Sequence, residues 1–230
     1  MGRKVRKLLG VVGGLGPWAT MYFLQEFLSQ QKAEKDQDYY PFLVDFATEV
    51  PDRTEAILSG RTAEVEQTLL ASIERLKRAG CNLIAIPCNT AHWFLAGKWD
   101  TFSVKILDMV SEVISRWEKE YPGKAFTLLA TLGTLRTGLY QEKVPEGLKL
   151  VTLPEDLRQA VHRIILQVKA NRLGEARESF ARLIPELGKL GAEGLILGCT
   201  ELGLALPEVD LPVLDSVKVL AGACLRELAM

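Results

Sequence analysis

The chain has little excess of either charge, few aromatic side chains and only two histidines. Its 230 residues include 28 Lys and Arg against 29 Asp and Glu, a net charge of -1, and aromatic residues make up 7%. Without a field of one sign, nucleic acid and anionic membranes are disfavoured as main partners. No apolar run is long enough to span a bilayer. No Cys-x-x-Cys pair occurs, so we expect no structural metal site.

The glycine-rich segment near the N-terminus also lacks the marks of a nucleotide-binding motif. Gly10-Val11-Val12-Gly13-Gly14-Leu15-Gly16 follows an apolar run but does not read G-x-G-x-x-G, and Asp45 lies too far along the chain to be its acidic partner. No G-K-[ST] sequence occurs, which excludes a P-loop. A nucleotide-binding module is therefore disfavoured, and we expect no cofactor.

The four cysteines do not require an oxidising compartment. A chain that is 48% hydrophobic has an ample core, so two disulfides are permitted by the even count but not needed. The basic segment Met1–Lys7 and the apolar segment Leu8–Trp18 resemble a signal peptide superficially. The glycines and Pro17 in the apolar part favour a short buried strand and a turn instead. We expect a cytoplasmic protein with free thiols.

Short apolar runs alternate with helical patterns along the chain. Strands are predicted at 8–12, 42–46, 83–86, 104–107, 126–130, 195–197 and 212–214. Helices are predicted at 18–31, 62–79, 108–120, 157–169, 173–190 and 217–228. Continuous apolar runs are typical of strands buried on both faces, so the alternation predicts an α/β protein with parallel sheets.

The two halves of the chain repeat one another. Each runs from a glycine turn through a helix to a strand, a cysteine, a second strand and an aspartate, with Cys88 and Asp108 in the first half and Cys199 and Asp215 in the second. Such a repeat predicts two similar lobes related by a pseudo-twofold axis. We expect a lobe of residues 1–107 plus 216–230 on the Cys88 side and a lobe of residues 108–215 on the Cys199 side. The active site is expected in the cleft between them.

Cys88 and Cys199 each follow a predicted strand directly. Ligands of parallel sheets bind beyond the carboxyl ends of the strands. Each cysteine precedes a small polar pair, Asn89-Thr90 or Thr200-Glu201, that favours a helix start. Backbone N–H groups at a helix start stabilise an anion, so we expect a lowered pKa for both thiols. If the lobes face each other, the two sulfurs approach one substrate from opposite sides.

This arrangement suits racemisation. The reaction removes a proton from one face of a carbon and returns one to the other, so it needs a base and an acid that exchange roles. A thiol and a thiolate can do this without a metal or cofactor. Donors for the developing carbanion are expected at Gly13-Gly14, Asn89, Thr90, Thr134 and Thr200. Cys81 and Cys224 are interpreted as core residues.

Four segments resemble the signatures of the aspartate/glutamate racemase family. They are Gly13-Gly14-Leu15-Gly16-Pro17-Trp18-Ala19-Thr20, Pro51-Asp52-Arg53-Thr54, Ile86-Pro87-Cys88-Asn89-Thr90-Ala91-His92 and Leu197-Gly198-Cys199-Thr200-Glu201. They occur in family order and cover most of the chain. The resemblance implies a PLP-independent enzyme of two flavodoxin-like lobes, with the two cysteines as catalytic acid and base, and a homodimer.

The details are more similar to the aspartate racemase branch than to the glutamate racemase of cell-wall synthesis. That enzyme has Asp-Ser-Gly in the first turn and a histidine where this chain has Glu201. The resemblance implies that Arg53 and Lys169 grip the carboxylates of a small dicarboxylic amino acid, and a loop arginine can do so bidentately. The full predicted set of substrate-binding residues is Gly14, Arg53, Asn89, Thr90, Thr131, Gly133, Thr134, Lys169, Thr200 and Glu201.

Several readings stay open. Aspartate is the first expected substrate, glutamate the second and a broader range of amino acids the third, because the segment around Lys169 lacks the glycine and tyrosine of many relatives. Maleate isomerases and hydantoin racemases are related alternatives, as is a binding protein with inert thiols. His92 is expected to position a helix or the Cys88 thiolate, and Glu201 to orient Thr200 or alter the pKa of Cys199. His162 is expected at the surface or half-buried.

Overall fold

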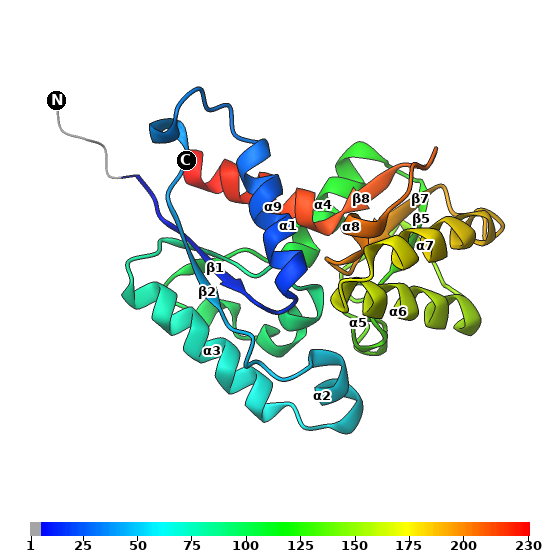
Figure 1. Cartoon of the computed structure of the whole chain (residues 1–230), viewed down its shortest axis with the longest axis horizontal. Coiled ribbons are helices and arrows are strands. Elements are labelled where there is room, and N and C mark those ends of the chain that lie inside the picture. The colour runs from blue at the N-terminus through cyan, green and yellow to red at the C-terminus, as the bar shows by residue number, and fades with distance from the viewer. Residues whose placement is uncertain (1–5) are drawn as a thin grey trace.

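Residues 6–230 are described by a computed structural model, in which the chain forms two α/β lobes (Figure 1). Most of the basic segment Met1–Lys7 lies outside the described residues, so our expectation about a signal peptide is tested only from Arg6 onward. The apolar part that follows is a buried strand and a turn, as predicted. Among the described residues, no helix combines the length and the apolar character needed to cross a membrane.

The first lobe is built on a parallel sheet with the strand order β2–β1–β3–β4. The strands are β1 (Leu9–Gly13), β2 (Phe42–Phe46), β3 (Leu83–Ala85) and β4 (Lys105–Ile106). The central strand β1 pairs with both β2 and β3, with Leu9 opposite Phe42 on one side and Leu83 on the other. All five residues of β1 are buried, because a central parallel strand is covered on both faces.

The second lobe repeats this topology, with the strand order β6–β5–β7–β8. The strands are β5 (Ala125–Leu129), β6 (Lys149–Val151), β7 (Gly194–Leu197) and β8 (Val213–Asp215). In each half of the chain, the second strand lies at one edge of the sheet, beside the first strand. The third strand leads to the cysteine of that half, Cys88 or Cys199. The predicted repeat is therefore confirmed at the level of strand order.

The helices cover both faces of each sheet. They are α1 (Pro17–Ser29), α2 (Arg53–Ser59), α3 (Ala63–Arg78), α4 (Met109–Glu120), α5 (Leu132–Arg136), α6 (Glu155–Lys169), α7 (Leu173–Gly188), α8 (Leu202–Ala205) and α9 (Ser216–Ala229), with 3-10 turns at Asp36–Asp38, Asn89–Leu95 and Trp99–Thr101. In the first lobe α3 packs on one face of the sheet, and α1 and α9 pack on the other. In the second lobe α6 and α7 pack on one face, and α4 on the other.

Helices α4 and α9 connect the lobes. Helix α4 follows the first sheet, but its Val110 and Val113 belong to the same core cluster as Phe126 of the second sheet. Helix α9 follows the second sheet, but its Val217 belongs to the same core cluster as Leu9 of the first. The two helices also contact each other, and α9 lies beside α1 between the two sheets in Figure 1. The chain thus crosses between the lobes twice.

Asp108 and Asp215, the two aspartates of the repeat, cap the N-termini of α4 and α9. The carboxylate of Asp108 accepts hydrogen bonds from the backbone N–H groups of Val110 (3.1 Å) and Ser111 (3.3 Å). Asp215 accepts one from Val217 at 2.8 Å. A carboxylate at this position satisfies N–H groups that have no partner within the helix and interacts favourably with the helix dipole. The repeat of aspartates is therefore a repeat of helix caps.

The sequence patterns missed the short elements. Strand β6 and helices α2, α5 and α8 were not predicted, since three to seven residues are too few to show a period. The predicted helix start after Cys88 is a 3-10 turn, and after Cys199 the four-residue α8 begins only at Leu202. Neither cysteine therefore lies at the start of a long helix.

We predict that Tyr22→Phe destabilises the protein. The Tyr22 hydroxyl donates to Asp215 Oδ2 at 2.7 Å, and burial raises the pKa of Asp215. Without this donor the buried carboxyl group loses a partner, so the free energy of unfolding should fall by about 1–3 kcal/mol. Urea denaturation at neutral pH measures the loss. The matched control is Tyr39→Phe, whose half-buried hydroxyl has no hydrogen-bond partner within residues 6–230; an equal loss in both variants would contradict the prediction.

Candidate active site

The ends of β3 and β7 carry Cys88 and Cys199 to one shared pocket. Both side chains are buried, with 8% and 5% of their surface exposed, and both line the pocket between the lobes. Cys199 follows Gly198, where a Cβ atom would collide with Leu128. Both thiols lie at the carboxyl end of a parallel sheet, which is where this topology places ligands.

The pocket is lined mostly by residues predicted from the sequence. Besides the two cysteines, the lining residues are Leu15, Asp52, Arg53, Thr54, Asn89, Thr90, Thr131, Lys169, Gly198, Thr200 and Glu201. Leu15, Asp52, Thr54 and Gly198 were missed, although all four lie inside the signature segments. Gly14, Gly133 and Thr134 were predicted but do not line the pocket.

The pocket is nearly closed in this structure. The space left between its walls is about 20 Å³, enough for a water molecule but not for an amino acid. A substrate can therefore enter only when the walls move apart. Those walls come from both lobes, since Asp52 precedes α2 and Lys169 ends α6.

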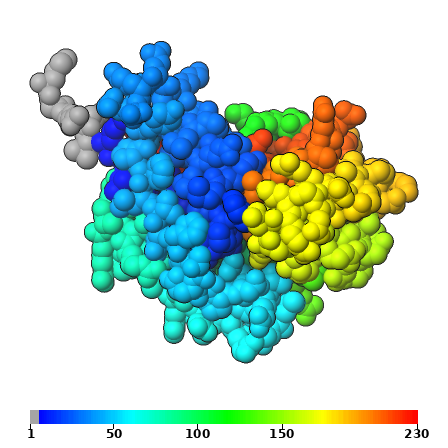
Figure 2. Space-filling model, viewed as in Figure 1, coloured from blue at the N-terminus to red at the C-terminus, as the bar shows by residue number. Residues whose placement is uncertain are grey.

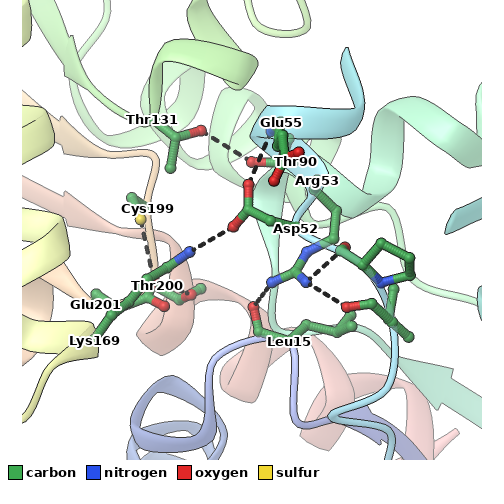
Figure 3. A network of polar contacts seen from close by, with 12 residues as sticks. Leu15, Asp52, Arg53, Glu55, Thr90, Thr131, Lys169, Cys199, Thr200 and Glu201 are labelled. Carbon is green, nitrogen blue, oxygen red and sulfur yellow. Dashed lines mark hydrogen bonds and ion pairs between the residues drawn. The ribbon is translucent and has the colours of Figure 1, made fainter. Parts of the chain in front are cut away.

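An ion pair between Asp52 and Lys169 closes the pocket (Figure 3). Lys169 Nζ donates to Asp52 Oδ2 at 3.3 Å, and Asp52 also accepts from the backbone N–H of Glu55 at 2.9 Å. Burial favours the neutral form of Asp52, but the Glu55 N–H and Lys169 outweigh it and lower the pKa of the carboxyl group. Burial likewise opposes the charge of Lys169, yet Glu201 and then Cys199 and Asp52 raise its pKa. Both groups stay charged at neutral pH.

Arg53 does not lie in a loop, as we had expected, but begins α2 and is buried. Its Nη1 donates to the carbonyl oxygens of Val50 (3.1 Å) and Pro51 (3.0 Å), and its Nη2 donates to that of Leu15. Nη1 thus uses both of its N–H groups on backbone carbonyl oxygens, whereas Nη2 keeps one N–H group beyond its bond to Leu15. Arg53 Nε is buried and has no hydrogen-bond partner within residues 6–230.

Glu201 lies against the Cys199 thiol. Cys199 Sγ donates to Glu201 Oε2 at 3.1 Å, and the Thr200 hydroxyl donates to the same oxygen at 3.2 Å. Burial and the adjacent Glu201 carboxylate raise the pKa of Cys199 well above its usual value. Our expectation of a lowered pKa is therefore wrong for Cys199, because desolvation and a like charge oppose the thiolate and no long helix starts here to favour it.

The second carboxylate oxygen of Glu201, Oε1, is a candidate contact for a ligand. Glu201 is 2% exposed, and its Oε1 has no hydrogen-bond partner in the described part of the chain. The carboxylate reaches over the glycine turn, since a Cβ atom at Gly16 would collide with Oε1. A buried carboxylate oxygen without a donor is costly, and a cationic group of a ligand would satisfy it.

Asn89 connects the two cysteine segments. Its Oδ1 accepts from the Tyr140 hydroxyl at 2.6 Å, and its Nδ2 donates to Ser216 Oγ at 3.0 Å. Ser216 Oγ in turn donates to the carbonyl oxygen of Leu197, the last residue of β7, at 2.7 Å. The Asn89 side chain is thus engaged with the second lobe.

Three threonine hydroxyl groups join the lobes on another side. Thr90 Oγ1 lies 3.1 Å from Thr131 Oγ1 and 2.8 Å from Thr134 Oγ1, and Thr131 and Thr134 are 3.1 Å apart. Thr131 also caps α5 by accepting from the Thr134 N–H at 3.1 Å. Gly133 is required beside them, because a Cβ atom would lie 2.9 Å from Thr54 Cα across the lobe boundary.

His92 positions the Cys88 backbone. Its Nε2 accepts from the Met109 N–H at 3.1 Å, which leaves Nδ1 to carry the proton and donate to the Cys88 carbonyl oxygen at 2.9 Å. The ring is 1% exposed, and burial lowers its pKa, so it stays neutral. His92 thereby links the Cys88 segment to the start of α4, in line with the positioning role that we expected.

Comparisons with known proteins identify the family of this chain. The sequence profile described as Asp/Glu/hydantoin racemase matches residues 12–224. The chain therefore belongs to the Asp/Glu/hydantoin racemase family, and the resemblance inferred from the signature segments is confirmed.

Among the relatives is the broad specificity amino-acid racemase RacX of Bacillus subtilis, 27% identical over 221 residues, which covers 93% of this chain and 95% of that one. Similar solved structures include the aspartate racemase of Picrophilus torridus, with 28% identity, a TM-score of 0.84 and coverage of 97% of this chain and 94% of that one. An aspartate racemase homologue from Pyrococcus horikoshii has the same fold, with 24% identity, a TM-score of 0.77 and coverage of 97% and 100%.

We predict that Glu201→Gln makes Cys199 more reactive. Removing the carboxylate beside the thiol lowers the pKa of Cys199, so more thiolate is present at pH 8, and alkylation by iodoacetamide should speed up by at least about tenfold. Mass spectrometry of the Cys199 peptide gives the rate, with the buried Cys81 in the same sample as the internal reference. An unchanged or slower rate at Cys199 would show that Glu201 does not hold the thiol protonated.

Proposed function

We propose that the protein interconverts the enantiomers of a small acidic amino acid, aspartate first and glutamate second, by proton transfer between Cys88 and Cys199, without PLP or another cofactor. The observation that carries the proposal is that one thiol from each lobe lines the same buried pocket. One sulfur takes the α-proton as base, and the other delivers a proton to the opposite face. The roles exchange for the reverse direction.

The protonation state of Cys199 suggests the direction of the first proton transfer. The pKa of Cys199 is raised by burial and Glu201, so its sulfur holds a proton at rest. We infer that, in the first turnover of the resting enzyme, Cys88 removes the α-proton of the substrate and Cys199 donates a proton to the opposite face. After one turnover the proton has moved from Cys199 to the product, and Cys88 holds the abstracted one. Exchange with solvent or turnover of the opposite enantiomer then resets the pair.

The pocket offers groups for each part of the substrate. We propose that the hydroxyl groups of Thr90 and Thr131 donate to the carboxylate whose charge grows as the α-proton leaves, and that they act strongly in a dry pocket. Thr200, whose hydroxyl donates to Glu201 in this structure, must turn toward the substrate to do the same. We propose that Arg53 Nε and Lys169 Nζ provide the cationic contacts. Glu201 Oε1, which lacks a donor, is the proposed partner of the ammonium group.

The remaining predicted residues are proposed to hold the walls of the pocket in place. Asn89, which lines the pocket, is proposed to fix the distance between the cysteine segments. Gly14, with a φ of 80°, lets the first turn approach Ala47, where a Cβ atom would lie 2.8 Å from the Ala47 nitrogen. Gly133 and Thr134 support the contact between the lobes.

We also propose the lobe boundaries inferred from the sequence, residues 1–107 plus 216–230 and residues 108–215. The packing of α9 on the first sheet and of α4 on the second supports this division. Substrate entry then requires the lobes to separate at the ion pair between Asp52 and Lys169. Because catalysis needs two free thiols, we infer that the protein works in a reducing cytoplasm; all four cysteines are free here.

The function is tested by α-proton exchange in D2O. We expect loss of the α-proton signal and inversion with at least one enantiomer pair of aspartate or glutamate, without PLP and with fresh reductant. Cys88→Ser and Cys199→Ser should each lower racemisation by roughly 10²–10⁴-fold, because each removes one acid–base group. The matched control is Cys81→Ser, which removes a buried thiol outside the pocket. Racemisation that survives either active-site substitution, or no exchange with any of the four compounds, would refute the proposal.

A homodimer is the expected assembly, and the exposed apolar side chains of the first lobe support it. Trp18 and Met21 on α1 are 41% and 54% exposed, and Phe46 at the end of β2 is 46% exposed. Exposed clusters of large apolar groups commonly mark interfaces. We propose that these side chains form one surface and that it joins two copies of the chain.

We predict that Met21→Glu weakens or abolishes the dimer, since a charge would be buried at the interface. Sedimentation equilibrium should report a dimer for the wild type and a monomer for the variant. Met230→Glu is the control, because Met230 is 76% exposed at the end of the chain. A monomeric wild type, or a dimer unaffected by Met21→Glu, would exclude this interface.

A further inference from the structure

A larger groove lies directly outside the catalytic pocket, between α2 of the first lobe and α6 of the second. Its volume is about 460 Å³, compared with about 20 Å³ inside the pocket. The two spaces share the walls formed by Asp52, Thr54, Thr131 and Lys169. In Figure 2 the cyan segment that contains α2 borders the yellow segment of the second lobe. When Asp52 and Lys169 separate, pocket and groove become one continuous space.

The α2–α6 groove has apolar side chains from both lobes in its walls. Leu58 and Leu166 line it with 57% and 46% of their surface exposed, next to the buried Ile165. Its one further carboxylate, Glu55, pairs with Arg61 at 3.0 Å. His162 also lines it; burial and Lys169 lower its pKa, so the ring is neutral at neutral pH. The groove therefore favours an uncharged side chain over a carboxylate.

The charges of the catalytic pocket also favour an amino acid with an uncharged side chain. Two carboxylates, Asp52 and Glu201, and two cations, Arg53 and Lys169, line it. The terminal nitrogens of Arg53 are bonded to backbone carbonyl groups, and Lys169 is paired with Asp52. An amino acid with a neutral side chain has no net charge, which matches the equal numbers of positive and negative groups in the pocket. A second carboxylate adds a negative charge that must compete with Asp52 for Lys169.

We propose that the α2–α6 groove is a side-chain subsite, and that the enzyme racemises amino acids with long, uncharged, apolar side chains, such as methionine and leucine. The proposal rests on the two-thiol reaction and extends its substrate range. The α-carbon lies between Cys88 and Cys199, and the side chain passes between Asp52 and Lys169 into the groove. There it covers Leu58 and Leu166, which otherwise face water, so its methylene groups contribute binding free energy.

The experiment compares α-proton exchange in D2O for L-aspartate, L-methionine and L-leucine. We expect exchange and inversion of methionine and leucine by the wild type. Leu166→Gln and Leu58→Gln should each lower the ratio of kcat/KM for methionine to that for aspartate by about tenfold, mainly through KM. Both residues are exposed, so folding should be preserved, and circular dichroism checks it. The matched control is Arg163→Gln, on an exposed position of α6 that does not line the groove; its ratio should change less than about twofold.

The outcomes separate this proposal from the proposed function. Exchange of aspartate without exchange of methionine or leucine would overturn the subsite and leave the two-thiol reaction standing. Exchange of methionine with a ratio that neither leucine substitution changes would overturn the groove as the subsite. Exchange of methionine but not of aspartate would support the subsite and refute aspartate as the substrate. No exchange with any compound would overturn both proposals.

Discussion

The buried amide of Asn89 ties the segment of Cys88 to the strand that leads to Cys199. Through Ser216 it reaches the carbonyl oxygen of Leu197, and Tyr140 satisfies its other end. Two thiols can serve opposite faces of one carbon only if their separation is set by groups that do not move during the reaction. Buried hydrogen bonds between the lobes provide this constraint, and the threonine triangle around Thr90 reinforces it. The catalytic geometry therefore depends on contacts between the lobes rather than within them.

The electrostatics of the pocket are built on the same lobe boundary. Asp52 from one lobe and Lys169 from the other form an ion pair over the pocket, and Lys169 also lies near Glu201 and Cys199. The enclosed space is too small for a substrate, so binding must exchange this ion pair for contacts with the ligand. Closure around the substrate excludes water, which strengthens every remaining interaction with the developing carbanion. Opening for entry and closing for chemistry are thus two states of one interface.

Much of the architecture could be predicted because it depends on local patterns. The long strands and helices follow from apolar runs and helical periodicity. The repeat of cysteines and aspartates predicted two similar lobes, and the structure shows that their sheets have the same strand order. Strand β6 was missed since Lys149–Val151 is a short, partly buried edge strand. The role of Arg53 could not be foreseen, because its guanidinium bonds to Leu15, a residue brought near only by the fold. Asp52 was missed as a pocket residue because its partner, Lys169, lies 117 positions away along the chain.

The sequence by itself determined the parallel α/β class, the family and which two cysteines line the pocket. These features could be read because strand ends and signature segments consist of contiguous residues. The protonation state of Cys199 was decided only by the tertiary structure. A helix start was expected to lower the pKa of Cys199, whereas burial and Glu201 raise it. A pKa reports the solvent and charges around a group in space, and those surroundings are assembled from both lobes when the chain folds.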